Sequence, residues 1–109
     1  MTALKGTYTV LITPMTIDQD IDIDGLKRNI DWQISSGIRG ICITGSTGEF
    51  ASLTREERLG IAEVAVNHIN GRIPCLVGTT AESTREAIFY AKHAKELGAD
   101  GVLILNPYF

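Results

Sequence analysis

The sequence predicts an α/β protein in which short buried strands alternate with helices. Four apolar runs are separated by three segments with helical signals, and two joints share one pattern: Gly37-Ile38-Arg39-Gly40-Ile41 and Gly98-Ala99-Asp100-Gly101-Val102. Such a regular alternation indicates a parallel sheet with helices packed against it. The repeat favours a β/α barrel. A doubly wound open sheet is the alternative, because periodicity does not separate the two.

The four apolar runs predict the strands of the sheet. Each run is short and ends at proline, glycine or polar residues, which is typical of buried strands. The predicted strands are Tyr8–Thr13, Ile41–Thr44, Ile73–Val77 and Val102–Leu105.

Three helices are expected between these strands. The first covers Asp24–Ser36, and Gly37 ends it. The second and third open on the pairs Thr54/Glu57 and Ser83/Glu86, each with the spacing of a capping box. Apolar residues recur at helical spacing in all three: Leu26, Ile30 and Ile34; Ala62, Val66 and Ile69; Ile88, Ala91 and Ala94.

Composition excludes several classes of function. The 109 residues carry a net charge of −3 and so lack the basic footprint of a nucleic-acid-binding protein. No apolar run approaches the roughly 20 residues that span a membrane, and the N-terminal segment does not resemble a signal peptide. Cys42 and Cys75 lie in strand-like runs and are expected to be reduced core residues, not metal ligands. We therefore expect a cytoplasmic protein, with residues 1–109 in one domain.

The most informative stretch is the loop Gly45–Phe50, with the sequence GSTGEF. It follows a predicted strand, and ligands of α/β proteins bind at the carboxyl ends of strands. Gly45 and Gly48 are expected to let the backbone turn sharply and approach a ligand. Ser46 and Thr47 offer hydroxyl and N–H donors, which suit a small anion and most naturally a carboxylate. The alternative is a polar turn that only joins a strand to a helix.

Four strands are half of an eight-stranded barrel, which needs about 250 residues. Half a barrel would leave two sheet edges and much apolar surface without a partner. The sequence is therefore expected to be a fragment of a longer protein, or else to close as a small open sheet or associate with copies of itself.

Several short motifs occur in a fixed order: Leu11-Ile12-Thr13-Pro14-Met15, Gly45-Ser46-Thr47-Gly48-Glu49, Leu53-Thr54 with Glu57-Arg58, Gly71-Arg72-Ile73-Pro74, Gly98-Ala99-Asp100-Gly101 and Pro107-Tyr108. Together they make the chain similar to the N-terminal third of the dihydrodipicolinate synthase / N-acetylneuraminate lyase family. The resemblance implies a (β/α)8 TIM barrel, of which this chain covers about the first four β/α units. It also implies a homotetramer.

The same resemblance implies the chemistry of a class I aldolase. A lysine on a later strand forms a Schiff base with a 2-oxo acid, typically pyruvate, and the resulting enamine adds to, or is released from, an aldehyde. Carried over to this chain, Thr47 binds the carboxylate through its hydroxyl and N–H, with Gly48 beside it in the clamp. Ser46 is the catalytic residue, in a proton relay with a tyrosine further along the chain. No cofactor is implied.

The lysine that performs this chemistry in the family lies beyond residue 109. The lysines of this chain fall in the N-terminal segment or on helices, where solvated side chains are expected: Lys5, Lys27, Lys92 and Lys95. Two hypotheses follow. The chain is the N-terminal part of a Schiff-base lyase, or it is a non-catalytic fragment that keeps the carboxylate-binding loop.

Two residues bear on the branch of the family. Dihydrodipicolinate synthases normally carry a tyrosine at the position of Phe109, and phenylalanine cannot pass a proton. Together with Phe50 after Glu49, this favours the sugar-acid branches, such as 2-keto-3-deoxygluconate aldolases or oxoglucarate dehydratases.

Other polar and aromatic residues have simpler expected roles. Glu49 is expected to hold the loop by accepting backbone N–H bonds, because a carboxylate would repel a bound carboxylate. His68 and His93 are expected on the surface, and Trp32 in packing. Thr13 ends the first strand, where its side chain either lines the site or makes a packing or turn contact.

Overall fold

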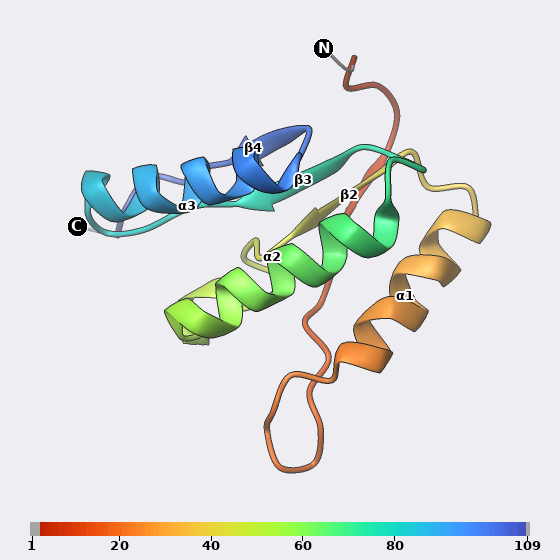
Figure 1. Ribbon diagram of the computed structural model, residues 1–109, viewed down its shortest axis with the longest axis horizontal. Coiled ribbons are helices and arrows are strands. Elements are labelled where there is room, and N and C mark those ends of the chain that lie inside the picture. The colour runs from red at the N-terminus through yellow and green to blue at the C-terminus, as the bar shows by residue number, and fades with distance from the viewer. Residues whose placement is uncertain (1–2, 109) are drawn as a thin grey trace.

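The computed structural model describes residues 3–108, which form one four-stranded parallel sheet (Figure 1). The strands are β1 (Tyr8–Val10), β2 (Gly40–Ile43), β3 (Cys75–Gly78) and β4 (Gly101–Leu103), and they lie in the order β1-β2-β3-β4. A doubly wound sheet reverses its strand order at a switch point. Here each strand is added on the same side of the preceding one, so the sheet has the order of a barrel segment and not of the open-sheet alternative.

Three helices cover one face of this sheet. They are α1 (Ile23–Ser35), α2 (Arg55–Ile69) and α3 (Thr84–Leu97), and Figure 1 shows them side by side in chain order. A short 3₁₀ helix, η1 (Phe50–Ser52), precedes α2 and was not expected from the sequence. The molecule measures 39 × 38 × 22 Å, and its short dimension is that of one layer of helices on one sheet.

The hydrophobic core lies between the sheet and the helices. Ile41 and Ile43 of β2 pack in one cluster with side chains of α1 and α2, among them Leu26, Ile30 and Ile61. All five are at most 1% exposed. Each such aliphatic side chain contributes roughly 2 kcal/mol when it is fully buried. This core holds the carboxyl end of β2, and therefore the loop that follows it, against the helix layer.

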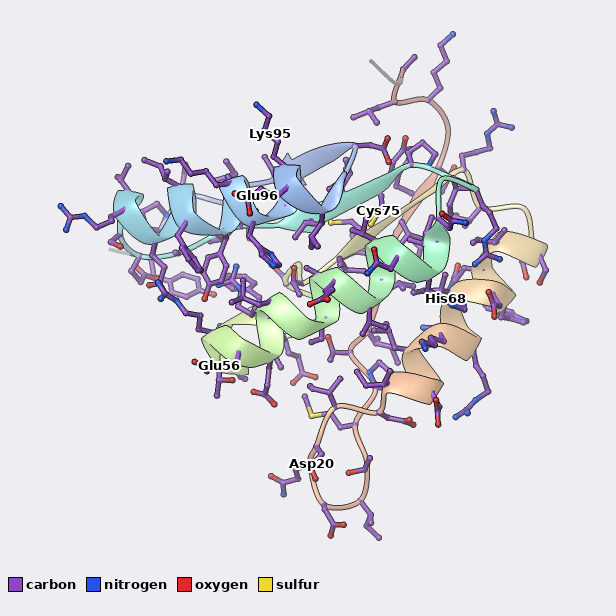
Figure 2. All side chains as sticks on the ribbon, in the orientation of Figure 1. Asp20, Glu56, His68, Cys75, Lys95 and Glu96 are labelled. Atoms are coloured by element: carbon purple, nitrogen blue, oxygen red, sulfur yellow. The ribbon has the colours of Figure 1, made fainter. Side chains whose placement is uncertain are left out.

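Both cysteines are free and buried, as expected. Figure 2 shows Cys75 within the fold, whereas Glu56, Lys95 and Asp20 project outward. Burial raises the pKa of the Cys42 thiol. Burial, and then the nearby Cys42 and Asp100, raise the pKa of Cys75 to about 12. Both groups are therefore neutral thiols at pH 7.

Both predicted N-caps are present, but only one of the two predicted capping boxes is complete. Thr54 Oγ1 accepts a hydrogen bond from the Glu57 N–H at 3.1 Å, and the Glu57 carboxylate accepts one from the Thr54 N–H at 2.8 Å. Ser83 Oγ likewise accepts from the Glu86 N–H at 3.1 Å. The Glu86 carboxylate, however, lies 3.4 Å from the Tyr90 hydroxyl and does not complete a second capping box.

Two expectations about packing are wrong. Ile88 was placed on the buried stripe of α3 but is 48% exposed, and Tyr90 and Ala94 are the buried residues of that helix. Trp32 was expected to pack but is 64% exposed. Helical spacing predicts a stripe along a helix but does not specify which side of it faces the sheet and the neighbouring helices.

The two similar joints have similar structures. Gly37 and Gly98 follow α1 and α3 with φ of 92° and 90°, a left-handed conformation that favours glycine. Gly40 and Gly101 then begin β2 and β4. A Cβ at Gly40 would collide with the Tyr8 ring, and one at Gly101 would lie 2.8 Å from Leu76 Cδ2. The Tyr8 ring on the neighbouring strand therefore leaves no room for a side chain at Gly40, whereas a shift of the Leu76 side chain could make room for one at Gly101.

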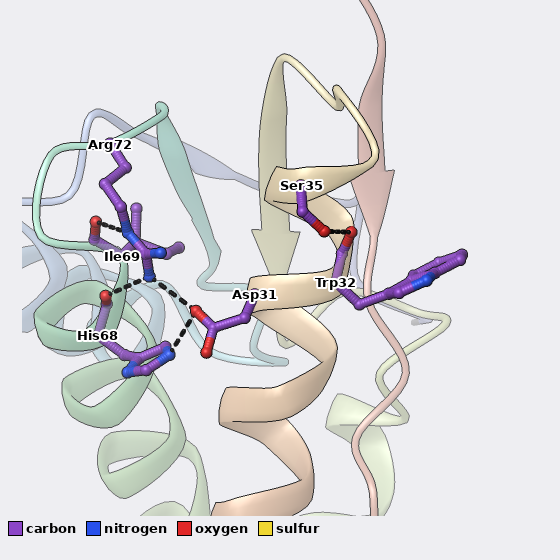
Figure 3. A network of polar contacts seen from close by, with 6 residues as sticks. All are labelled: Asp31, Trp32, Ser35, His68, Ile69 and Arg72. Carbon is purple, nitrogen blue, oxygen red and sulfur yellow. Dashed lines mark hydrogen bonds and ion pairs between the residues drawn. The ribbon is translucent and has the colours of Figure 1, made fainter.

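A polar network joins α1 to the end of α2 (Figure 3). One carboxylate oxygen of Asp31 lies 2.9 Å from His68 Nε2 and 3.0 Å from an Arg72 guanidinium nitrogen. Arg72 also donates to the His68 carbonyl oxygen at 2.7 Å. His68 is therefore a partner of Asp31 and not a free surface side chain. The hydrogen bond from Arg72, followed by that from His68, lowers the pKa of Asp31.

We predict that Thr54→Ala lowers the free energy of unfolding by about 1 kcal/mol, because the first turn of α2 loses its cap. Urea denaturation measures the difference. Thr84→Ala is the matched control, since Thr84 is an exposed threonine in the first turn of α3 and is not its N-cap. An equal loss in both variants would contradict the role of the cap.

We also predict that Asp31→Asn lowers stability at pH 7 and that the loss disappears in acid. The lowered pKa means that ionised Asp31 stabilises the fold above its ordinary value of 3.8, and that this contribution fades as the pH falls through the folded value. Thermal unfolding between pH 7 and pH 2 measures it. Asp18→Asn, which changes an exposed carboxylate outside this network, should show no such pH-dependent gap.

Candidate functional site

The loop Gly45–Phe50 lies directly after β2, at the carboxyl edge of the parallel sheet. Ser46 and Thr47 are exposed, whereas Gly45 and Gly48 are buried. Phe50 begins η1 and is 7% exposed. The loop thus presents its two hydroxyl side chains to solvent and fixes its glycines and its aromatic residue in the protein.

The glycines of the loop act by size and not by backbone conformation. The left-handed residues here are Thr44 and Glu49, with φ of 51° and 60°, and neither Gly45 nor Gly48 has a positive φ. A Cβ at Gly45 would lie 2.9 Å from Val10 Cγ1, and one at Gly48 would lie 3.1 Å from the Leu11 carbonyl oxygen. The expectation that these glycines make the sharp turn is wrong. They let the loop lie against the end of β1.

Hydrogen bonds close the loop on itself and tie it to β1. The Glu49 N–H donates to the Ser46 carbonyl oxygen at 3.0 Å, and the Phe50 N–H donates to that of Gly45 at 3.4 Å. Thr13 Oγ1 donates to the Gly48 carbonyl oxygen at 2.7 Å, in a buried bond. The sequence left the role of Thr13 open between the site and a turn contact, and the structure shows that it binds the loop backbone.

Several donors of the loop are left for a ligand. Within residues 3–108, the backbone N–H groups of Ser46, Thr47 and Gly48 donate to no other protein group, and the hydroxyls of Ser46 and Thr47 have no side-chain partner. Successive unpaired N–H groups make a concave anion-binding surface. The arrangement can therefore bind a small anion by several hydrogen bonds at once.

Thr44, just before the loop, and Arg58, at the start of α2, both bind the backbone at the end of β3. Thr44 Oγ1 lies 3.0 Å from the carbonyl oxygen of Gly78, at the end of β3, and 2.7 Å from that of Ile43. Arg58 of α2 donates to the Gly78 carbonyl oxygen at 3.2 Å and to that of Thr80 at 2.9 Å. The ends of β2, β3 and α2 are thereby joined.

Arg58 is buried although it is charged. It is 7% exposed, and its guanidinium carbon lies 3.8 Å from the centre of the Tyr90 ring and 5.3 Å from that of Phe50. Burial lowers its pKa, against the opposing effects of Tyr90 and Glu86. The sequence contained a signal for this residue, because Arg58 stands four residues before Ala62 on the buried stripe of α2.

The sequence also singled out Glu49, four lysines and Phe109. Glu49 is exposed and its side chain makes no capping hydrogen bond, so its expected role in holding the loop is wrong. The lysines Lys5, Lys27, Lys92 and Lys95 are all exposed, as expected. Phe109 lies outside the described residues. Among residues 3–108, no three histidine, cysteine or acidic side chains gather in a group that could hold a metal ion.

The strand order defines a segment of a parallel β/α barrel, with the loop at the edge where ligands of such barrels bind. A sequence model of the dihydrodipicolinate synthetase family matches residues 3–109. The chain therefore belongs to this family, as the sequence motifs predicted. In the part that the structure describes, no helix is long and apolar enough to cross a membrane.

Individual relatives agree with the family match. The chain is 46% identical over 108 residues to a 4-hydroxy-tetrahydrodipicolinate synthase of Gluconacetobacter diazotrophicus, which covers 99% of this chain and 36% of that protein. The crystal structure of dihydrodipicolinate synthase from Aquifex aeolicus has a TM-score of 0.94 and 38% identity, over 97% of this chain and 36% of its own. The chain thus spans about a third of the length of these relatives and corresponds to the first four strands of their barrel.

A further solved relative was crystallised with a ligand. YagE of Escherichia coli K12, a member of the dihydrodipicolinic acid synthase family, was crystallised in complex with pyruvate. Its TM-score to this chain is 0.91 at 39% identity, over 94% of this chain and 34% of that protein.

We predict that Arg58→Met lowers the free energy of unfolding by about 2 kcal/mol, because the Thr80 carbonyl group loses its donor from Arg58 and the Gly78 carbonyl group keeps only Thr44. Urea denaturation provides the measurement. Arg28→Met is the control, since the Arg28 side chain is 74% exposed and 3.8 Å from its nearest carboxylate partner. Similar losses in the two variants would contradict a specific role of Arg58.

Proposed function

We propose that the protein to which this chain belongs is a lyase that forms a Schiff base with pyruvate or another 2-oxo acid. In this proposal, the loop after β2 binds the carboxylate of that acid. The observation that carries it is the row of unpaired N–H groups at Ser46, Thr47 and Gly48, at the carboxyl edge of a barrel sheet. Membership in the dihydrodipicolinate synthetase family and the pyruvate complex of YagE support the choice of ligand.

Each loop residue has a role in this proposal. Thr47 binds the carboxylate through its hydroxyl and its N–H, and the N–H of Gly48 adds a donor beside it. Ser46 relays a proton, together with a tyrosine further along the chain. Glu49 is exposed and is given no role in binding the acid.

The covalent chemistry follows from the functional groups. A lysine amine adds to the carbonyl carbon of the 2-oxo acid, and water leaves to give the imine. Loss of a proton from the adjacent carbon gives an enamine, which forms a carbon–carbon bond with an aldehyde, and water then releases the product and restores the amine. The four lysines of this chain are exposed, whereas a nucleophilic lysine needs a desolvated amine. We therefore place that lysine beyond residue 109.

Two candidate branches remain for the second substrate. The names of the curated relatives favour a 4-hydroxy-tetrahydrodipicolinate synthase. Phe109, in place of the usual tyrosine, favours a 2-keto-3-deoxy sugar acid aldolase or dehydratase. By analogy with the family we propose a cytoplasmic homotetramer. The alternative is a non-catalytic fragment that binds the acid without reacting with it.

The test is intact mass spectrometry after incubation with pyruvate and borohydride. A reduced pyruvate adduct on a protein longer than 109 residues is the expected result. An adduct on a chain of 109 residues would contradict the placement of the lysine. A mass that corresponds to a chain of 109 residues, with no adduct, would support the non-catalytic alternative.

We predict that Thr47→Val weakens pyruvate binding about tenfold, since one hydrogen bond to a charged carboxylate is worth roughly 1.5 kcal/mol. Titration of the ¹⁵N-labelled protein with pyruvate, followed through the amide signals of the loop, gives the dissociation constant. Thr7→Val is the matched control, because Thr7 is exposed and lies at the opposite end of β1. Unchanged affinity in Thr47→Val would refute the assigned role.

A further inference from the structure

The end of β1 contacts the loop through one buried side chain. Thr13 lies just beyond β1, is 7% exposed, and donates through Oγ1 to the Gly48 carbonyl oxygen at 2.7 Å. We infer that Thr13 is a positioning residue, whose hydroxyl holds the Gly48–Glu49 peptide in the orientation that lets the loop bind a carboxylate. This inference rests on the proposed function, because it concerns the same site.

Both ends of that peptide group are bonded. The carbonyl oxygen and the N–H of a trans peptide point in opposite directions. Here the carbonyl of Gly48 accepts from Thr13, while the N–H of Glu49 donates to the Ser46 carbonyl oxygen at 3.0 Å. The two bonds together fix the plane of the peptide and close the turn that contains Thr47.

The backbone of Glu49 shows why a fixed peptide is needed. Its φ of 60° is left-handed, which is unfavourable for a residue with a Cβ. Rotation of the Gly48–Glu49 peptide changes ψ of Gly48 and φ of Glu49 together and would return Glu49 to a negative φ. The bond from Thr13 opposes that rotation, since a rotated carbonyl points away from the hydroxyl.

Rotation would also change the electrostatics of the site. The carbonyl oxygen of Gly48 carries a partial negative charge, which Thr13 now keeps on the buried side of the loop. Turned away from Thr13, this oxygen would lie near the unpaired N–H groups and repel a carboxylate there. The hydroxyl of Thr13 thus favours carboxylate binding without touching the ligand.

The packing allows this hydroxyl to be removed without changing volume. A Cβ at Gly48 would lie 3.2 Å from Thr13 Oγ1, so the loop is in close contact with this side chain. Valine has the shape of threonine and lacks only the donor. Thr9 in β1 provides a matched control, because its Oγ1 donates to Gln33 Oε1 at 3.0 Å and makes no hydrogen bond to the loop.

The experiment is a titration of the ¹⁵N-labelled protein with sodium pyruvate, read from the amide signals of Ser46, Thr47 and Gly48. Thr13→Val is expected to bind about fivefold more weakly than the wild type, which corresponds to the loss of one buried hydrogen bond. Thr9→Val and Thr13→Ser, which keep a hydroxyl at position 13, are expected to bind within twofold of the wild type.

Each outcome decides the inference. Wild-type affinity in Thr13→Val, or an equal loss in Thr9→Val, would overturn the role of Thr13 and leave the proposed function intact. A wild type that shows no saturable shifts would overturn the proposed function and the inference with it. If Thr13→Val does not fold, Thr13→Ser decides, since retained affinity supports the hydroxyl and lost affinity in a folded protein contradicts it.

Discussion

The pairing of β2 with a parallel strand on each side is the constraint on which the rest of the structure depends. All four residues of Gly40–Ile43 are buried, and the strand bonds to β1 and β3. Ile41 and Ile43 pack against the helices, on the face of the sheet opposite to the side chain of Cys42. Because the strand cannot move along its neighbours without losing these contacts, the loop after it has a fixed position.

Hydrogen bonds from side chains connect the ends of the strands and the loop that follows β2. Thr13, Thr44 and Arg58 each hydrogen-bond to a backbone carbonyl group near the carboxyl edge of the sheet. Buried carbonyl groups need such partners, since an unsatisfied one costs roughly 1–3 kcal/mol. The N–H groups of Ser46, Thr47 and Gly48 remain unpaired among the described residues, and the proposed carboxylate site depends on them.

The residues that sequence reasoning misjudged share a physical cause. Gly48 was assigned to a sharp turn, but it is small because the carbonyl of Leu11 lies against it, and the left-handed turn falls on Glu49. The buried face of a helix depends on which elements pack against it, and Ile88 and Trp32 lie on exposed parts of their helices. These are contacts between segments far apart in the chain, and no local pattern encodes them.

The sequence by itself determined the alternation of strands and helices, the cap at Thr54, the helix-ending glycines and the position of the Gly45–Phe50 loop after a strand. Those features depend on local propensities and short-range hydrogen bonds. Only the tertiary structure decided the strand order, the carbonyl groups that Arg58 binds and the bond from Thr13 to Gly48. The reason is that hydrogen bonds across 35 residues exist only after the strands have paired and brought their ends together.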